Sequence, residues 1–297
     1  MLFAHPAGPD VPPLTGVRML TGWVVEPLPL LAVLLAGGLY AYGVSRLRRR
    51  GDAWSPWRTA SFLGPGIGSI VLATSSAVAA YDTILLWAHM VQHMLLAMVA
   101  PIFLALGAPV TLALRTLPPR GRRSLLALLH SRAAAVLTFP VVAGGLYVVT
   151  PYALYLTGLY EQTLRNPLAH DLNHLHLVLV GCLWFWVVLG LDPLPRRPAY
   201  PLRMLAVFAT LPFHAILGVT IMGASTPLAG DWYAGLARAW GPSLAEDQRL
   251  AGGLLWGSGD IVGIVVLAAL FAQWARESER EAAREDRRLD RLDRTSG

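Results

Sequence analysis

The chain alternates long apolar segments with short polar ones, and each apolar segment is long enough to cross a bilayer. Each holds about 18 to 23 residues, and a helix of that length spans a hydrocarbon core of about 30 Å. The second segment is rich in glycine, alanine and serine, which allow close helix packing within a bundle. The pattern predicts seven transmembrane helices, over residues 28–45, 61–80, 84–106, 134–156, 170–191, 202–223 and 254–274.

The composition agrees with an all-α integral membrane bundle. Hydrophobic residues make up 55% of the 297 residues and charged residues 14%, against about 25% charged residues in a soluble domain. Residues 1–27 lack both a basic start and an apolar core, so they do not resemble a cleaved signal peptide. We expect an outer leader over 1–27, a seven-helix membrane domain over 28–275 and a charged cytoplasmic tail over 276–297.

The positive charge predicts how the bundle is oriented. All 24 basic residues are arginine. Five arginines follow the first apolar segment, five the third, three the fifth and seven the last. These 20 arginines all fall on the same side of the membrane. Only four lie on the other side, namely Arg18, Arg165, Arg238 and Arg249. The positive-inside rule then places the N-terminus outside and the C-terminus in the cytoplasm. The net charge of +6 therefore reports orientation and does not indicate nucleic-acid binding.

Six of the eight histidines lie within the apolar segments or at their mouths. Counted from the outer ends, His89 lies about 8 Å deep, and His93 and His214 lie about 13 Å deep. His170 lies at the mouth of the fifth segment, and His174 lies about one turn below it. Ionisable groups at membrane depth are costly and usually face the protein interior, where they bind something or relay protons. The overlapping depths indicate that several of these imidazoles border one cavity.

Spacing and residue type favour a metal site in this outer half. Residues four apart share a helix face, so His89 can act with His93 and His170 with His174. Imidazole combined with thioether suits Cu(I). We predict a Cu(I) site whose candidate ligands are His89, His93, His170, His174, His176 and His214. The candidate supporting residues are Gln92, Met90, Met94, Asp171 and Asp260, of which Asp260 lies about 9 Å deep.

These residues also have structural interpretations. His176 lies about 200° around the helix from His174, so it faces elsewhere or has a second role. A lone histidine such as His214 packs more often than it ligates, and the same holds for the methionines. His130 in an inner loop and His5 in the leader are expected to lie outside the site.

Two other classes of function are compatible with the same histidines. A bis-His haem membrane cytochrome needs facing imidazoles, which His93 and His174 could supply. A membrane di-iron oxygenase also uses HxxxH pairs, but it needs more histidines and access from the cytoplasm. The placement of these histidines near the outer face counts against the oxygenase.

Four stretches resemble the CtaG-type multi-span cytochrome c oxidase assembly factors, in the version common in high-GC Gram-positive bacteria. The stretches are WAHMVQHMLLAMVAPIFLALGAPVTLALR, DLNHLHLVLVGCLWFWVVLGLDPLPRRPAYPLRM, LPFHAILGV and AEDQRLAGGLLWGSGD. The motifs HMxQHM and DPxPRR are the most specific part of this resemblance. The family pattern falls on His89, Gln92, His93, Pro101, Gly107, Pro109, Arg115, His174, His176, Asp192, Pro193, Arg196, His214, Asp247, Gln248 and Trp256. Asp260 departs from it, because glutamate is expected there.

The resemblance implies a non-enzymatic role in maturing haem-copper oxidase at the outer face of the bacterial plasma membrane. It implies copper as the metal handled. The implied partners are subunits of the oxidase and a copper donor or copper-transport protein, which we expect to be a separate chain.

The arginine asymmetry yields a test of topology. Reporter fusions after Tyr160 and Asp290 are expected to read outside and inside, because an odd number of spans separates the two termini. The same side for both fusions would contradict the odd span count.

Overall fold

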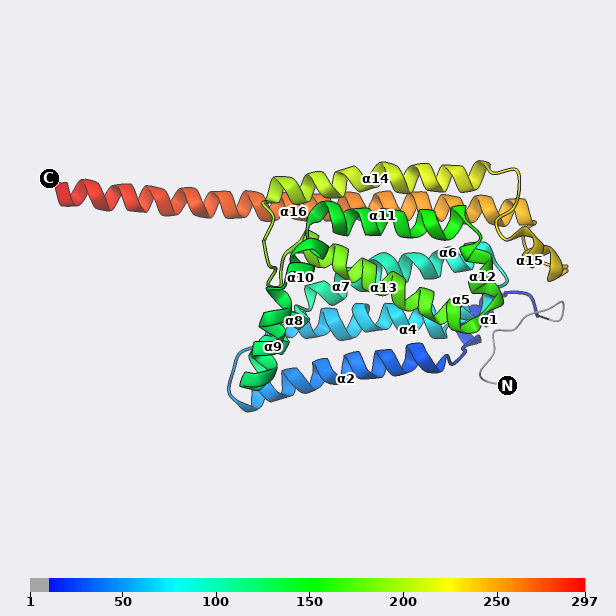
Figure 1. Ribbon diagram of the computed structural model, residues 1–297, viewed down its shortest axis with the longest axis horizontal. Coiled ribbons are helices and arrows are strands. Elements are labelled where there is room, and N and C mark those ends of the chain that lie inside the picture. Colours follow the sequence, from blue (N-terminus) through cyan, green and yellow to red (C-terminus); the bar gives the residue numbers. More distant parts are fainter. Residues whose placement is uncertain (1–10, 297) are drawn as a thin grey trace.

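The molecule is a bundle of long helices packed side by side (Figure 1). The computed structural model describes residues 11–296, with side chains for residues 11–288. Six of its helical segments are long and apolar enough to cross a membrane. They are α2 (Pro27–Arg49), the broken segment Pro56–Tyr81, the segment Leu86–Leu106, α13 (Pro167–Leu189), α14 (Tyr200–Gly223) and α16 (Leu244–Ser296).

A seventh span comes from a bent pair. Helix α11 (Pro140–Leu156) and helix α12 (Leu159–Arg165) meet at 71°. Taken together, they are also long and apolar enough to cross a membrane. The all-α membrane architecture predicted from the sequence is therefore confirmed, with six spans or seven when the pair counts as one. The orientation of the termini stays a prediction.

Several predicted boundaries are corrected. The fourth segment was expected over 134–156, but its first residues form the separate helix α10 (Arg132–Leu137). Helix α11 starts only at Pro140, because proline fits the first turn of a helix and not its interior. Helix α16 begins earlier than the predicted 254 and continues past 274, so the charged tail prolongs the last span, as Figure 1 shows.

Two spans contain π-helical turns beside a proline. The segment Pro56–Tyr81 is built of α3 (Pro56–Ser61), η1 (Phe62–Gly66), α4 (Ile67–Ser75) and α5 (Ala77–Tyr81). The segment Leu86–Leu106 is built of α6 (Leu86–Met94), η2 (Leu95–Val99) and α7 (Ala100–Leu106). Pro65 lies inside η1, and Pro101 lies two residues after the end of η2. Because proline offers no N–H, the helix widens locally at these points.

The widened turn before Pro101 is matched by a glycine on the neighbouring span. The Ala97 carbonyl would normally accept a hydrogen bond from residue 101, which as proline cannot donate one. Gly181 of α13 packs directly against this carbonyl, and a Cβ at that position would overlap it. Close approach of α13 therefore depends on the missing side chain, as in other small-residue contacts between membrane helices.

The short helices lie at the ends of the bundle. They are α1 (Gly16–Thr21), α8 (Pro109–Thr116), α9 (Pro119–Leu129), α10, α12 and α15 (Gly230–Gly235). Asp192 caps α8 by accepting from the amides of Val110 at 3.0 Å and Thr111 at 2.8 Å. Buried Arg203 donates to the carbonyls of Val188 and Leu189 at the end of α13. The DPxPRR region thus joins three helix ends.

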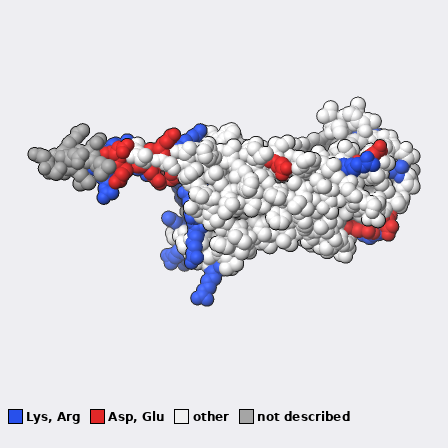
Figure 2. Space-filling view, turned by 90° about the horizontal axis from the view of Figure 1, so that it is seen from above, with Lys and Arg blue, Asp and Glu red and all other residues white. Residues whose placement is uncertain are grey.

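Charge and apolar surface are separated. Figure 2 shows arginines gathered at the end of the bundle from which α16 projects, whereas the sides carry few charges. Large apolar side chains such as Leu34, Leu39 and Phe208 are more than 60% exposed along those sides. Such a surface is suited to lipid contact. The segment Leu86–Leu106, which carries HMxQHM, is the most buried of the candidate spans.

The Gly181 contact yields a stability test. Gly181→Ala is expected to lower the thermal unfolding temperature of the detergent-purified protein, because overpacking costs roughly 1–3 kcal/mol. Gly145→Ala in α11 is the matched control, since nothing lies within 4 Å of the added carbon. The control is expected to gain roughly 0.5–1 kcal/mol. Equal unfolding temperatures for the two variants would contradict the close packing.

Candidate metal centre

Two overlapping groups of ligand atoms lie near the ends of the spans opposite the arginine-rich end. Atoms of Asp82, His170 and His174 lie within 4.8 Å of one another, and so do atoms of Glu26, Asp171 and His174. His174 belongs to both groups. We call the first group the buried triad, because none of its members is more than 3% exposed. Groups so fully buried are expected to bind each other or an ion.

Local sequence explains how these side chains meet. Helix α13 begins at Pro167, and the Asn166 side chain caps it by accepting from two backbone amides. His170 and His174 then fall four residues apart on one face, with ring centroids 4.4 Å apart. Asp82 follows the short helix α5, and one carboxylate oxygen lies 2.9 Å from Nε2 of His170. Glu26 precedes α2, with an oxygen 3.8 Å from Nδ1 of His174.

Gln92 fixes the orientation of His174. Its Nε2 donates to the Ala73 carbonyl at 2.9 Å, and its Oε1 lies 3.0 Å from Nε2 of His174. A carbonyl can only accept, so the Gln92 amide must present oxygen to the imidazole. His174 therefore carries a proton on Nε2, which leaves Nδ1, on the Glu26 side, as the nitrogen available to a metal ion. Orienting a ligand in this way is the usual task of residues behind a metal site, and Gln92 was predicted to have it.

His89 lies next to the buried triad. Its ring centroid is 6.4 Å from that of His170 and 4.7 Å from that of Tyr160. Both ring nitrogens of His89 are buried and have no hydrogen-bond partner among the described residues. Buried polar atoms rarely stay unpaired, and a bound ion or water is a common explanation. With metal–nitrogen distances of about 2.0–2.1 Å, two imidazoles that share an ion have ring centroids roughly 6 Å apart. His89 and His170 are therefore spaced like two imidazoles that share an ion, whereas His89 lies outside both groups of close ligand atoms.

His93 and His214 form a different group deeper in the bundle. They line a small cavity together with Tyr147. The Tyr155 hydroxyl lies 3.0 Å from Nδ1 of His93 and 3.8 Å from the sulfur of Met90. His214 donates from Nδ1 to the Thr210 carbonyl at 3.3 Å.

The other predicted residues are placed away from the triad. His176 is exposed and lies 3.1 Å from the Thr150 hydroxyl, away from His174 as its place in the helix predicts, and its role as a metal ligand stays a prediction. Asp260 accepts from Trp256, and Met94 packs in the apolar core. The single cavity expected for all these groups is thus divided in two, because α14 and α16 pack on the opposite side of α6 from α2 (Figure 1). His5 lies outside the described residues.

Glu26 and Asp82, just beyond the ends of the first two apolar segments, were not among the ligands predicted from the sequence. The signal was present, since both are carboxylates at the level of His170. What spacing could not supply is contact between different helices. Asp171, predicted as a supporting residue, is placed with the potential ligands.

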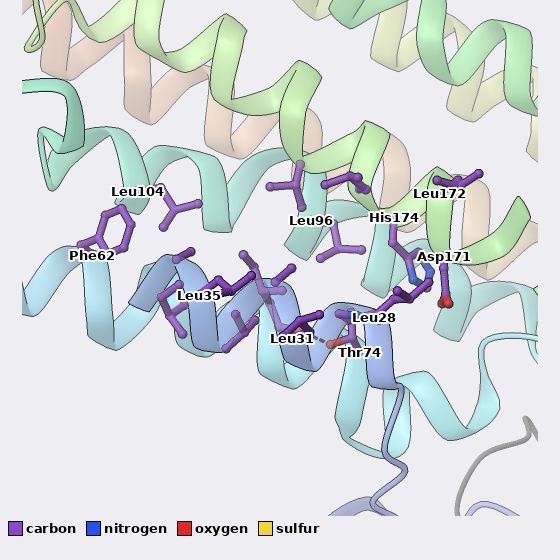
Figure 3. A pocket seen from close by; sticks show the side chains of 18 residues that line it. Leu28, Leu31, Leu35, Phe62, Thr74, Leu96, Leu104, Asp171, Leu172 and His174 are labelled. Atoms are coloured by element: carbon purple, nitrogen blue, oxygen red, sulfur yellow. Dashed lines mark hydrogen bonds between the residues drawn. The ribbon is translucent and has the colours of Figure 1, made fainter. Parts of the chain in front are cut away.

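A cavity of about 450 Å³ on the lipid-facing side reaches His174 and Asp171, whereas Glu26, Asp82 and His170 do not line it. Figure 3 shows its walls, with Leu28, Leu31 and Leu35 of α2 on one side and Leu96 and Leu104 among the residues on the other. His174 and Asp171 lie at one end of the otherwise apolar lining. The candidate centre is therefore reached from within the membrane layer.

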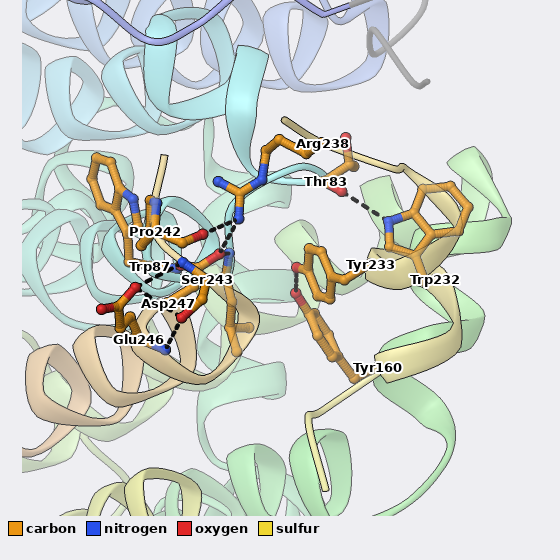
Figure 4. Close-up of polar contacts among 11 residues, drawn as sticks. Thr83, Trp87, Tyr160, Trp232, Tyr233, Arg238, Pro242, Ser243, Glu246 and Asp247 are labelled. Atoms are coloured by element: carbon orange, nitrogen blue, oxygen red, sulfur yellow. Dashed lines mark hydrogen bonds and ion pairs between the residues drawn. The ribbon is translucent and has the colours of Figure 1, made fainter. Parts of the chain in front are cut away.

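The outer connections hold α6 in position. Asp247 at the start of α16 accepts from the backbone amides of Leu86 at 3.1 Å and Trp87 at 2.9 Å, which caps α6 (Figure 4). Arg238 lies 3.6 Å from the Asp247 carboxylate and donates to the Pro242 carbonyl. The role of Asp247 in the family pattern is therefore structural.

A second set of contacts fixes the same region. Trp232 donates to the Thr83 carbonyl at 2.8 Å, next to Asp82, and the hydroxyls of Tyr233 and Tyr160 lie 2.6 Å apart (Figure 4). Burial raises the pKa of Tyr233, so its hydroxyl stays protonated at neutral pH. These bonds fix the turn that presents Asp82 to His170.

Comparison with known proteins finds similarity over most of the chain. The family model described as cytochrome c oxidase caa3 assembly factor matches residues 38–277. Uncharacterized proteins of Mycobacterium bovis and Mycobacterium tuberculosis are each 40% identical over 286 residues, covering 94% of this chain and 43% of their own length. One of Mycobacterium leprae is 36% identical over 281 residues, with 92% and 42% covered. The chain thus spans less than half the length of these relatives. No solved structure matches.

The Gln92 contacts generate a test of the site. Gln92→Met is expected to weaken Cu(II) binding by the purified protein about 10- to 100-fold, because the orientation of His174 is lost. Gln162→Met, on the exposed side of α12, is the control and should bind like wild type. Affinity is measured by competition with a chelator of known affinity, after thermal unfolding has verified the fold. If Gln92→Met binds Cu(II) with the same affinity as wild type, Gln92 does not orient a metal ligand.

Proposed function

The chain belongs to the family of cytochrome c oxidase caa3 assembly factors, and we propose that it carries a copper ion to a haem-copper oxidase in the bacterial plasma membrane. Copper is the cargo in this proposal and not a resident cofactor. The oxidase subunits that receive it are the first partner. A separate copper donor or copper-transport protein is the second.

The observation that carries the proposal is the buried triad of Asp82, His170 and His174, with unpaired His89 beside it. Imidazole nitrogens are good copper ligands, and copper binds nitrogen and oxygen sites more tightly than the other common divalent metals. The mixed imidazole and carboxylate set favours Cu(II). The sulfur of Met90 near His93 offers a softer environment, which suits the Cu(I) expected from the sequence.

Transfer requires a site that binds the ion without trapping it. The triad offers few donors, so an incoming ligand from the client could complete the coordination and compete for the ion. His174 also belongs to the group formed with Glu26 and Asp171. An ion that first binds this group would reach the triad by staying bound to His174 while the carboxylate of Asp82 replaces those of Glu26 and Asp171. We propose this as the route from the outer face.

The membrane setting supports a client that is itself embedded in the bilayer. The cavity beside the triad opens on the lipid-facing side, and its walls are apolar apart from the site residues and Thr74. A water-soluble carrier would have to cross this apolar layer, whereas a neighbouring membrane subunit would not. The haem and di-iron alternatives stay predictions.

The proposal is tested on the client. In cells that depend on this chain for oxidase maturation, His174→Gln and Asp82→Asn are expected to lower the copper-to-haem ratio of the purified oxidase. Both changes keep the side-chain volume, and both remove a ligand. Haem content should be normal, and added copper should restore part of the activity.

His130→Gln is the control, because His130 is exposed at the arginine-rich end and bonds only the Leu126 carbonyl of its own helix. It should give wild-type oxidase. Copper-replete oxidase from both triad variants would refute copper delivery through this site. Loss of haem together with copper would point to a general assembly role instead.

A further inference from the structure

Four arginines from separate parts of the chain surround one hollow at the arginine-rich end of the bundle. They are Arg50, Arg115, Arg122 and Arg123, and the hollow has a volume of about 650 Å³. Arg50 ends α2, Arg115 lies in the last turn of α8, and the other two lie in the first turns of α9. The fold, and not the sequence order, brings them together.

Part of this cluster is held in place by the protein. Arg115 donates to the Ala53 carbonyl at 3.1 Å, and its guanidinium lies 5.8 Å from the centre of the Trp54 ring. Arg58 lies over the same ring at 5.2 Å. Stacking of this kind restricts a guanidinium while leaving donors for another group. Arg115 is therefore preorganised at the edge of the hollow.

The positive charge of the hollow is not balanced by nearby carboxylates. Asp52 lies 3.9 Å from Arg115, and both side chains are at least 40% exposed, so this ion pair is weak. Asp192 is the other carboxylate close by, and it is engaged in capping α8. Several guanidinium groups around one hollow repel each other unless an anion joins them. Arginine is also the residue best suited to bind phosphate through paired N–H donors.

Apolar side chains form part of the walls of the hollow. Leu114, Leu117 and Leu126 line it beside the arginines. Helix α9 lies across the end of the bundle in Figure 1, where the ends of the spans meet the polar layer of the membrane. A ligand that fits this hollow therefore has an anionic head and an apolar chain. Free phosphate or a nucleotide would use the arginines and leave the leucines uncovered.

We propose that this hollow binds the headgroup of an anionic phospholipid, with the phosphate between the guanidinium groups and an acyl chain along the leucines. Basic hollows between membrane helices bind acidic lipid headgroups by the same physics. The bound lipid would tie α9 to the end of α2, because Arg50 and Arg122 come from those two elements. This site lies at the opposite end of the molecule from the candidate metal centre.

The test compares charge inside the hollow with equal charge outside it. The full chain in detergent is titrated with phosphatidylglycerol or phosphatidylcholine, and bound lipids are counted by native mass spectrometry. Arg122→Gln/Arg123→Gln is expected to weaken phosphatidylglycerol binding about 30-fold, from roughly one kcal/mol for each arginine. Arg49→Gln/Arg120→Gln removes the same charge from exposed positions that do not line the hollow. This control should bind at least about tenfold more tightly than the hollow variant.

Three outcomes would overturn the proposal. Equal weakening by the two double variants would mean general attraction to a basic surface. If the wild-type protein binds phosphatidylcholine as tightly as phosphatidylglycerol, the site does not recognise an anionic headgroup. Displacement of phosphatidylglycerol by millimolar inorganic phosphate would identify a site for a free anion. All four substituted arginines are exposed, so the variants are expected to fold, which gel filtration and thermal unfolding verify.

Discussion

The amide of Gln92 joins three helices at the centre of the bundle, and the geometry of the candidate centre depends on it. The side chain lies on α6, donates to a carbonyl of α4 and accepts from His174 of α13. In a bilayer these groups have no water as an alternative partner, so each must be satisfied within the protein. The N–H group of the Gln92 amide thus holds α6 against α4, and its oxygen holds α6 against α13. The same oxygen requires a proton on Nε2 of His174.

The same requirement explains the irregular features of the bundle. Pro101 leaves the Ala97 carbonyl without its usual partner, the helix widens before it, and Gly181 allows α13 to pack against the exposed carbonyl. At the outer end, the first amides of α6 are capped by Asp247 from a span far away in the sequence. Each of these features also positions a site residue, because α6 carries Gln92 and His89, and α13 carries His170 and His174.

The two ends of the molecule carry different chemistry. One end buries carboxylates with imidazoles, which is suited to holding a metal ion. The other gathers arginines around a partly apolar hollow, which is suited to an anionic headgroup. The bilayer accounts for this division, since charge is tolerated at the membrane surfaces and becomes costly between them. An assembly factor that works on a membrane client would thus be held in the lipid at one end and present its cargo at the other.

The sequence by itself determined the all-α membrane class and the six or seven apolar segments long enough to span a bilayer. Segment length and hydropathy depend only on local sequence, and a bilayer imposes a fixed thickness, so seven apolar segments were enough to predict the architecture. Depth along a helix follows from counting residues, which is why His89, His170 and His174 were correctly taken as neighbours in level. The pairing of Gln92 with an imidazole also followed from residue type.

Only the tertiary structure decided which of these residues meet. Depth fixes position along the membrane normal, but the neighbours of a helix are set by packing, to which Gly181 and Asp247 contribute through contacts distant in sequence. For this reason Asp82 and Glu26 joined the histidines of α13, whereas His214 joined His93 at a separate, smaller cavity. The helical period predicted that His176 faces away from His174, but its partner Thr150 became apparent only from the packing of α11 on α13.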